Sequence, residues 1–343
     1  MSVRIFLAVL FLHLSCVANA QGYAGLGTTA DGFAVPDPNY TLSFPRDDGA
    51  HPEFRVEWWY LTANLKDDFG RDYGIQWTLF RTAGRPEAGE GWSSPQIWMG
   101  HAAATSSDLH HSNEIFSRGA IGQAGAQAQP FEAWIDDWTL RADPDHPGDM
   151  IVNAGGDRFS FRLNLSGNTG RVLHGANGFS VKSPLGQSSH YYSLPFLDAR
   201  GTLELEGESF QVSGDAWLDR EWSSQPLSSD QTGWDWVGLK FDDGRRLMAA
   251  RVRGNGPDFH FGTLINKEGD VIELSNEELT IRPMSEGIPP TRLSIEVPKL
   301  QIAVAVKALN PSAFTGNLFP YWEGPVQVSG THSGSGYLEM TGY

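Results

Sequence analysis

One stretch of sequence occurs twice in this chain and decides its fold. Residues 58–71 read WWYLTANLKDDFGR, and residues 234–245 read WDWVGLKFDDGR. Each copy begins with a Trp-rich run of strand-forming residues. Each then continues into an Asp-rich tip with a Gly, which supplies the positive φ that a short hairpin turn needs. Each copy therefore predicts a strand, a tight turn and a second strand.

A second pair of matching segments lies towards the end of each half. Residues 212–219 read VSGDAWLD, and residues 328–339 read VSGTHSGSGYLE. In both, an aromatic residue and a carboxylate are two positions apart, so they share one face of a strand. The common order of the two pairs favours an internal duplication. Its boundary falls in the Ser- and Pro-containing stretch between residues 222 and 233.

The rest of the chain has the pattern of antiparallel sheets. From about residue 40, short runs with alternating apolar residues are separated by Gly, Asp and Pro clusters. No window of 12 or more residues has a convincing helical stripe. We therefore predict an all-β fold with two units, residues 40–225 and 226–343, after a flexible lead-in of residues 21–39. Closing each sheet into a barrel would protect its edges.

The first twenty residues have the composition of a secretory signal peptide. Arg4 precedes an apolar run over residues 5–12, and Ala18-Asn19-Ala20 predicts cleavage after Ala20. A lipoprotein anchored through Cys16 is the less favoured alternative, because residues 13–15 fit that signal poorly. The apolar run is too short to span a bilayer, so we expect an exported, periplasmic or secreted protein without an integral membrane segment.

Composition and motifs argue against several classes of protein. A formal charge of −16 does not suit nucleic-acid binding, which needs clustered Lys and Arg. The sequence contains neither a phosphate-binding loop nor a GxSxG elbow, and its GLGTTA run at residues 25–30 precedes the first strand. His110 and His111, near Asp108, lack the spacing of zinc ligands, and we interpret them as part of a polar loop. We expect no cofactor and no metal.

Two runs of residues place aromatic and ionisable side chains together. His190 and Tyr192 share one face of a predicted strand, and Trp217, Asp219 and Glu221 share one face of another. Desolvation disfavours the ionised form of a carboxyl group in an aromatic pocket, so such an acid stays protonated near neutral pH and can donate its proton. The alternative is that Asp219 lies at a strand end, paired with solvent or with neighbouring loops.

Adding water across a trisubstituted alkene needs groups of this kind. An acid protonates the double bond, aromatic faces stabilise the tertiary cation, and a base positions the water. We predict Asp219 as the acid, Trp217 with Tyr192 as the aromatic groups and His190 as the base. We expect six further side chains to contact a ligand: Glu57, Trp59, His101, Glu221, Trp234 and Trp236. For His101 a structural role is the alternative.

Four segments resemble a known family. They are FPRDDGAHPEFRVEWWY (residues 44–60), WLDREW (217–222), GWDW (233–236) and GYLEMTGY (336–343). Together they look like the AttH-like secreted proteins, which are grouped with carotenoid 1,2-hydratase and with fungal hydratases of prenylated phenolics. The resemblance runs from about residue 40 to the last residue. It implies two lipocalin-like (calycin) barrels in tandem.

The resemblance also bears on the candidate site. In the carotenoid hydratase branch the important residues are a His-x-aromatic pair and an aromatic-x-Asp pair, which His190 with Tyr192 and Trp217 with Asp219 match. The aromatic residues differ in kind from those of the carotenoid enzymes, which leaves other apolar substrates open. Members of the family are often labelled secreted hydrolases, but no nucleophile motif supports that label in this sequence.

We therefore expect an exported lipocalin-like protein that binds a hydrophobic, isoprenoid-like or lipid-like small molecule. An enzyme of this kind would be a hydro-lyase that needs no cofactor, with its site in or beside the first barrel near the junction and the second barrel as support. A non-catalytic carrier and a structural envelope protein are the alternatives. Asn39 and Asn164 lie in sequons that matter only in a eukaryotic host. The sequence leaves the oligomeric state open.

Overall fold

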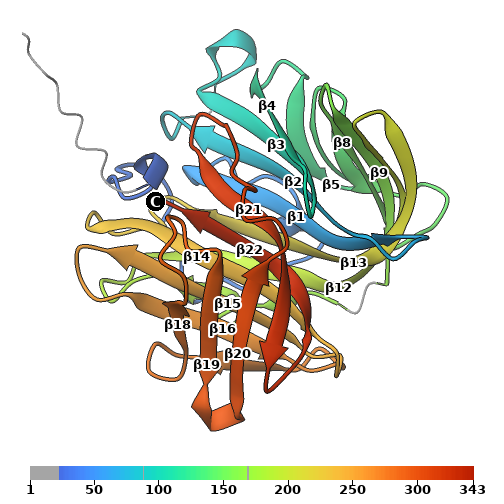
Figure 1. Cartoon of the computed structure of the whole chain (residues 1–343). Coiled ribbons are helices and arrows are strands. Elements are labelled where there is room, and N and C mark those ends of the chain that lie inside the picture. Colours follow the sequence, from blue (N-terminus) through green and yellow to red (C-terminus); the bar gives the residue numbers. More distant parts are fainter. Residues whose placement is uncertain (1–22, 88, 168–169) are drawn as a thin grey trace, which may run out of the picture.

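Two antiparallel sheets account for most of the structure (Figure 1), a computed structural model that describes residues 23–87, 89–167 and 170–343. The strands of the first sheet are β1 (Val56–Asp67), β2 (Asp72–Ala83), β3 (Gln96–Ser106), β4 (His110–Arg118), β5 (Ala124–Ala128), β6 (Phe131–Ile135), β7 (Trp138–Ala142), β8 (Met150–Gly155), β9 (Phe159–Ser166), β10 (Val172–Leu173), β11 (Phe179–Val181), β12 (Ser188–Leu205) and β13 (Glu208–Ser223). The strands of the second are β14 (Gln231–Phe241), β15 (Arg246–Gly254), β16 (Phe259–Ile265), β17 (Val271–Leu274), β18 (Thr280–Pro283), β19 (Arg292–Val297), β20 (Ile302–Ala308), β21 (Tyr321–Gly330) and β22 (Gly334–Thr341). Short 3-10 turns are η1 (Tyr23–Gly25), η2 (Arg46–Asp48), η3 (Gly91–Ser93) and η4 (Pro298–Leu300).

The two halves share one topology. The first sheet has the order β4-β3-β2-β1-β13-β12-β9-β8-β7-β6-β5, with β10 and β11 also paired to β12, and curls into a nearly closed barrel. The second has the order β17-β16-β15-β14-β22-β21-β20-β19-β18 and forms a half-barrel. In each, the first strand pairs with both the second and the last. The predictions of an all-β fold and of tandem lipocalin-like units are confirmed.

The repeated stretch of sequence forms equivalent hairpins. The tip between β1 and β2 contains Gly70 at φ 79°, and the tip between β14 and β15 contains Gly244 at φ 93°. The aromatic-x-carboxylate segments form the last strands, where Asp219 pairs with Tyr60 and Glu339 pairs with Trp236. The two carboxyl groups therefore occupy equivalent positions in the two halves.

Each sheet has its own core on its inner face. The side chains that fill the first barrel include Leu61, Trp77 and Leu218, and those inside the second sheet include Val237 and Leu338. Because alternate residues of a strand face opposite sides, the neighbours of these residues point outward. The barrel interiors are thus occupied by protein side chains.

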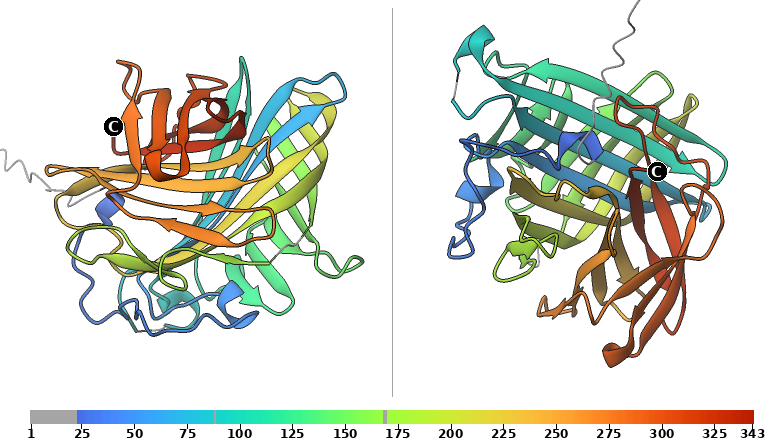
Figure 2. Two further views of the ribbon diagram at one scale, coloured as in Figure 1. Left: turned by 90° about the horizontal axis from the view of Figure 1, so that it is seen from below. Right: turned by 90° about the vertical axis from the view of Figure 1, so that its left-hand side faces the viewer.

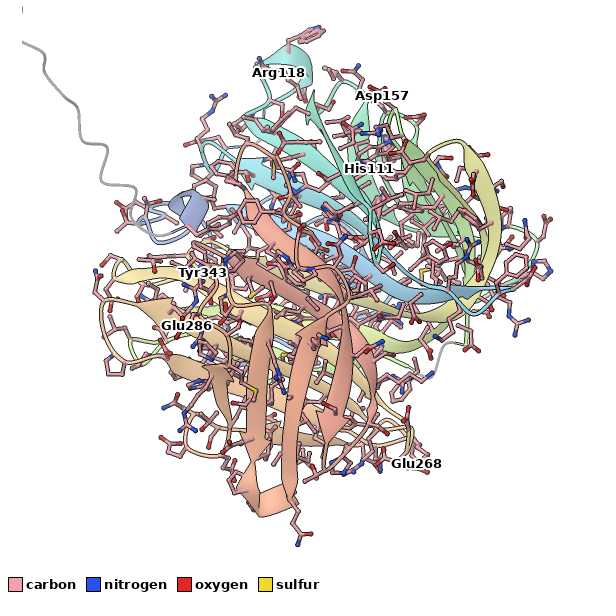
Figure 3. The ribbon with its side chains drawn as sticks, in the orientation of Figure 1. His111, Arg118, Asp157, Glu268, Glu286 and Tyr343 are labelled. Atoms are coloured by element: carbon pink, nitrogen blue, oxygen red, sulfur yellow. The ribbon has the colours of Figure 1, made fainter. Side chains whose placement is uncertain are left out.

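A third apolar cluster joins the outer faces of the two sheets, which pack against each other (Figure 2). Its buried members come from both halves: Tyr60, Val172, Tyr191, Trp217, Trp236, Met248, Ala250, Ile265 and Tyr337. Exposed acidic side chains such as Asp157, Glu268 and Glu286 lie on the outer loops instead (Figure 3). The interface between the sheets is therefore aromatic, although the chain as a whole is acidic.

The N-terminal segment that was predicted as a flexible lead-in makes specific contacts. The ring of Tyr23 meets the ring of Trp234 edge to face at 5.3 Å, and the backbone N–H of Ala34 donates to the carbonyl of Glu53 at 3.0 Å. The predicted signal peptide (residues 1–20), Cys16 and the cleavage site lie outside the described residues. Within the described ranges, no helix is long and apolar enough to cross a membrane.

One local prediction was wrong. His110 and His111 do not lie in a loop but begin β4, where they pair with Thr105 and Ala104 of β3. The Thr105 hydroxyl lies 2.9 Å from His110 Nδ1, and His111 Nε2 lies 2.7 Å from a carboxylate oxygen of Glu206. Pairing with β3 provides hydrogen-bond partners for the backbone of this polar run. The composition of the run alone could not indicate this pairing.

Candidate functional site

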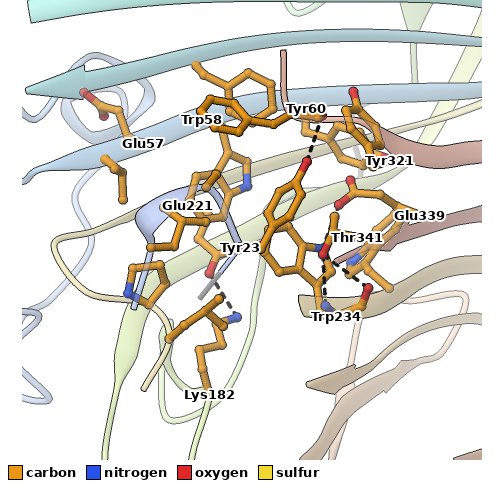
Figure 4. Close-up of a pocket in the computed structure, with 18 of the residues that line it drawn as sticks. Tyr23, Glu57, Trp58, Tyr60, Lys182, Glu221, Trp234, Tyr321, Glu339 and Thr341 are labelled. Atoms are coloured by element: carbon orange, nitrogen blue, oxygen red, sulfur yellow. Dashed lines mark hydrogen bonds and ion pairs between the residues drawn. The ribbon is translucent and has the colours of Figure 1, made fainter. Parts of the chain in front are cut away.

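A cavity of about 420 Å³ lies between the outer faces of the two sheets (Figure 4). This volume is in the range of pockets that hold small molecules. The aromatic side chains that line it come from both sheets and from two loops: Tyr23, Trp58, Tyr60, Phe80, Tyr191, Trp234, Trp236, Phe261, Phe319 and Tyr321. The cavity lies beside the first barrel at the junction. The second sheet also supplies part of the wall, through Trp234, Trp236 and Tyr321.

The segment that begins with η1, residues 23–28, covers one side of the cavity. Tyr23 Oη donates to the carbonyl of Phe319 at 2.9 Å. Arg55 Nη1 donates to Thr28 Oγ1 at 2.6 Å and so ties the end of the segment to the start of β1. Leu26 lines the cavity between these two attachments.

Asp219 is one of three carboxyl groups of the first sheet that line this cavity, with Glu57 and Glu221. It lies on the outer face of β13, is 3 % exposed, and lines the wall. Its carboxyl accepts hydrogen bonds from Trp217 Nε1 at 2.6 Å, from Tyr191 Oη at 2.9 Å, and from Ser193 Oγ. All three donors are neutral. Among the ion pairs of the described residues, none involves Asp219.

Burial dominates the acidity of Asp219. Desolvation raises the pKa of this carboxyl from its ordinary 3.8 to about 7, although the hydrogen bonds from Ser193, Trp217 and Tyr191 oppose the shift. The nearby charge of Glu221 raises the pKa further. A group with this pKa is present in both protonation states near neutral pH, which is the condition for efficient general acid catalysis.

A buried chain of polar groups supports Asp219 from behind. Ser193 Oγ lies 2.6 Å from His174 Nε2, and His174 Nδ1 lies 2.9 Å from Thr263 Oγ1 of β16. Burial holds the pKa of His174 well below its usual range, so the ring is neutral. The pattern fits a ring that donates from Nε2 to Ser193 and accepts from Thr263, which leaves the Ser193 hydroxyl to donate to Asp219.

One cation also lines the cavity close to Asp219. Lys182 Nζ lies 3.0 Å from a carboxylate oxygen of Glu221, and it sits 4.6 Å from the ring centre of Tyr191 and 4.3 Å from that of Phe261. Burial lowers the pKa of Lys182, while the charge of Glu221 raises it in part. Lys182 is therefore ion-paired to Glu221, and its charge also interacts with that of Asp219, with which it forms no ion pair.

The second sheet contributes its own carboxyl group. Glu339 accepts a hydrogen bond from Trp234 Nε1 at 2.6 Å (Figure 4). Desolvation raises the pKa of Glu339 to about 7, with a further increase from the charge of Asp219. Burial thus raises the pKa of one carboxyl group from each half, Asp219 and Glu339, among the four that line the cavity.

The structure separates His190 and Tyr192 from Asp219. Both lie on the opposite face of β12, because Tyr191 and Ser193 are the residues that pair with Glu221 and Asp219. Tyr192 Oη donates to Asp48 Oδ1 at 2.6 Å, and the ring of His190 packs against the ring of Tyr40, with 4.8 Å between their centres. The predicted grouping of these two residues with Asp219 was therefore wrong, and the aromatic partners of Asp219 are Trp217 and Tyr191.

Glu57 and Trp59 face the interior of the first barrel. Glu57 borders the cavity, but its carboxylate is held by Arg81 and Arg220 and accepts from the His51 backbone N–H at 2.9 Å. Burial alone would raise the pKa of Glu57, yet Arg220, Arg81 and His51 hold it well below its usual range. Trp59 is buried, and the Arg220 guanidinium carbon lies 3.7 Å from the centre of its ring.

The other predicted contact residues border the cavity. Trp234, Trp236, Glu221 and His101 all line it. Sequence reasoning missed Tyr191, Ser193, His174, Lys182, Tyr60 and Glu339 as parts of one site. The repeated aromatic-x-carboxylate pattern was the signal for Glu339, since it placed this residue at the position of Asp219. No local pattern marks His174 or Lys182, which follow β10 and β11 and reach the site because both strands pair with β12.

Three solved structures share the fold. A candidate AttH protein from Nitrosomonas europaea has a TM-score of 0.79 and 29% identity, with 91% of this chain and 100% of that chain covered. Kievitone hydratase from Nectria haematococca has a TM-score of 0.64 and 13% identity, with 90% and 98% covered. CghA, solved with Sch210972, has a TM-score of 0.55 and 11% identity, with 90% and 97% covered. No curated protein sequence matches. The AttH-like family model matches residues 35–343, so the chain belongs to the AttH-like family.

Proposed function

We propose that the cavity binds a neutral, largely apolar small molecule that carries an alkene, and that Asp219 donates a proton to it in a hydration without a cofactor. The observation that carries the proposal is the state of Asp219, a buried carboxyl with a pKa of about 7 and only neutral hydrogen-bond donors. Such an acid holds its proton near neutral pH beside an apolar ligand.

The surrounding side chains suit the cation that this proton transfer creates. Protonation of a trisubstituted double bond leaves a tertiary cation, which aromatic faces stabilise by their negative quadrupole. Trp58, Tyr60 and Trp236 line the same cavity as Asp219. Water then adds to the cation and completes the hydration. The fold that the chain shares with kievitone hydratase, whose name describes such a reaction, is in keeping with this proposal.

A non-catalytic carrier is the second candidate function. The aromatic wall and the volume of about 420 Å³ favour binding of an apolar molecule whether or not chemistry follows. We also propose that the protein is exported and cleaved after Ala20. N-terminal sequencing of the mature protein from its own cells tests that proposal, because an N-terminus other than Gln21 contradicts it.

Asp219→Asn separates catalysis from binding. The probes are geraniol and farnesol for hydration, followed by mass spectrometry in 18O-labelled water, and the neutral fluorophore N-phenyl-1-naphthylamine for binding. We expect Asp219→Asn to slow hydration by about 100-fold or more, because the amide cannot donate an acidic proton. The affinity for the fluorophore should change by less than about threefold, since a near-isosteric amide removes no contact area. The matched control is Asp198→Asn, at an exposed position of β12.

The results for hydration and for fluorophore binding distinguish the candidate functions. Hydration by Asp219→Asn at the wild-type rate would exclude Asp219 as the acid. Binding of the fluorophore without hydration of either alkene by the wild-type protein would favour the carrier. If the fluorophore does not bind at all, both functions fail and a structural envelope role becomes the better explanation.

A further inference from the structure

Two glutamate side chains lie directly opposite each other in the second sheet, at the edge of the cavity. Glu323 of β21 and Glu339 of β22 are cross-strand partners. Glu323 is 1 % exposed, and Glu339 lines the cavity. Like charges directly opposite each other on a sheet repel, and burial makes the repulsion stronger. The pair is therefore stable only when it holds a proton.

The partners of this pair are neutral donors. Tyr60 Oη donates to Glu323 Oε1 at 3.1 Å, and Trp234 Nε1 donates to Glu339 Oε1 at 2.6 Å. Glu323 Oε2 is buried and has no hydrogen-bond partner among the described residues. Asp235, another buried carboxyl group of the same sheet, has charged partners instead, because it is ion-paired to both Arg251 and Arg253. A purely structural pair would be expected to have such cations, so the arrangement points to proton chemistry.

A series of polar side chains leads from this pair towards the surface. The Tyr321 hydroxyl stabilises the ionised form of Glu323 and lies 2.9 Å from His101 Nδ1. His101 Nε2 lies 2.9 Å from Glu114 Oε1, and the Glu114 side chain is 16% exposed. Tyr321 and His101 can each accept a proton on one side and release one on the other. The chain can therefore carry a proton between the buried pair and solvent.

We infer that Glu339 is the base that takes the proton from the adding water, and that Glu323 positions it and links it to the chain through Tyr321 and His101. This inference rests on the proposed hydration at the same cavity. It gives the two equivalent carboxyl positions opposite roles: Asp219 from the first half is the acid, and Glu339 from the second is the base. The base predicted from sequence, His190, lies on the other face of β12.

The proton balance closes over one turnover. Asp219 gives its proton to one alkene carbon, where a C–H bond forms, and becomes a carboxylate. Water forms a C–O bond to the cationic carbon and loses one proton to the Glu339 carboxylate. Glu339 passes this proton through Glu323, Tyr321 and His101 to solvent, and Asp219 takes up a proton before the next turnover. The net reaction adds one water molecule and needs no other reagent.

The charges that face Glu339 determine its pH dependence. Glu323 and Tyr321 face it from β21, Tyr60 from β1, Tyr23 from η1, Tyr337 from its own strand, and Asp219 and Glu221 from β13. Lys182, Arg55 and Arg81 also line the cavity, but Lys182 is paired with Glu221, Arg81 is paired with Glu57, and Arg55 binds Thr28. We therefore expect Glu339 to titrate as one member of the pair with Glu323.

Infrared spectroscopy of protein with 13C-labelled glutamate tests the pair without any substrate. The label separates glutamate carboxyl bands from those of Asp219. We expect the wild type to show a protonated glutamate band that titrates near pH 7, where the pKa of Glu339 lies. Glu339→Gln and Glu323→Gln should each abolish this titration. The matched control is Glu273→Gln, at an exposed position of β17, which should leave it unchanged. An unchanged titration in Glu339→Gln would overturn the inference.

Kinetics on geraniol then test the role of the base. A reaction that needs protonated Asp219 and ionised Glu339 has a bell-shaped dependence of kcat on pH. We expect Glu339→Gln to lower kcat by about 100-fold with KM within about threefold, and to remove the rising limb. Glu323→Gln should shift that limb and lower kcat less, because it acts through Glu339. A wild-type kcat and pH profile in Glu339→Gln would exclude Glu339 as the base.

The two hypotheses fail in different ways. If Asp219→Asn retains activity while Glu339→Gln loses it, the acid assignment fails and the base assignment stands. If the wild type hydrates neither geraniol nor farnesol, the proposed function fails. In that case an intact glutamate titration shows proton sharing without this reaction, and the assignment of Glu339 as its base is overturned too.

Discussion

Glu57 and Asp219 lie on neighbouring strands, β1 and β13, and the environment of each gives it the opposite chemistry. Both are buried, at 0 % and 3 % exposure, but their side chains point to opposite faces of the sheet. The pKa of Glu57 is held well below its usual range, whereas that of Asp219 is raised to about 7. Burial alone therefore does not decide the protonation state of a carboxyl group.

The partners of the two groups explain the difference. Glu57 has two guanidinium groups, from Arg81 and Arg220, which offset the cost of burying its charge. Asp219 has only the hydroxyl and indole donors of Tyr191, Ser193 and Trp217. A carboxylate that is fully ion-paired contributes to the structure, while one with neutral partners can exchange its proton. The contrast supports the proposal that Asp219, and not Glu57, acts on a ligand.

The largest expected effect comes from removing one of the two arginines that pair with Glu57. Arg220→Met leaves the charge of Glu57 with Arg81 as its remaining guanidinium partner and removes the cation over Trp59. We expect a loss of about 3 to 5 kcal/mol in the free energy of unfolding, the usual cost of removing one partner of a buried ion pair. Urea unfolding at neutral pH measures it. Arg200→Met, at an exposed position of β12, is the matched control, and a loss as small as that of the control would contradict the prediction.

A second test uses the pH dependence of stability. The pKa of Asp219 is higher in the folded protein (about 7) than its ordinary value of 3.8, so the folded state binds more protons between these values. Stability should therefore fall as pH rises from about 4 to about 7, by up to about 4 kcal/mol for this group. Glu57 has the opposite sign, because its lowered pKa gives a contribution that is present above about pH 4 and lost as pH falls further.

Asp219→Asn should remove the Asp219 part of this dependence. Unfolding curves at several pH values would then show a smaller decline between about pH 4 and about pH 7 than the wild type shows. The remaining decline would come from Glu323 and Glu339, whose pKa values burial also raises. Equal slopes in wild type and variant would mean that Asp219 is ionised throughout.

The smallest effect concerns a single donor. Trp217→Phe keeps the aromatic ring but removes the N–H that donates to Asp219 Oδ1. A hydrogen bond to a charged group contributes about 1.5 to 3 kcal/mol, so its loss should raise the pKa of Asp219 by about one unit or more. NMR titration of 13C-labelled aspartate measures the shift. Trp92→Phe, at an exposed position, is the control. A lowered or unchanged pKa would show that the indole N–H does not stabilise the carboxylate.

The fold was more predictable from sequence than the site. The hairpin tips with Gly70 and Gly244 and the alternating runs depend on local chemistry, which the sequence shows directly. The faces of single strands were also predicted correctly, since His190 and Tyr192 share one face and Trp217 and Asp219 share another. Whether the His190 face of β12 lies on the same side of the sheet as the Asp219 face of β13 depends on the pairing register of the two strands.

That register could not be predicted from the sequence. It determines which side chains of β12 lie beside Asp219. It places Tyr191 and Ser193 beside Glu221 and Asp219, and it directs His190 away from them. His174 joins the site because β10 pairs with β12, and Lys182 joins it through the adjoining loop. These contacts depend on the packing of the complete sheets, which leaves no local signal in the sequence.

The pairing of the first strand with the last in each half has a consequence for how the protein is made. Val56 of β1 pairs with Ser223, and Asp235 of β14 pairs with Met340, so both contacts join residues far apart along the chain. Such non-local contacts form late and slowly during folding. The closing strands β13 and β22 are also those that carry Asp219 and Glu339. The two carboxyl groups lie between the outer faces of the two sheets, so their raised pKa values would appear only once both halves have closed and packed against each other.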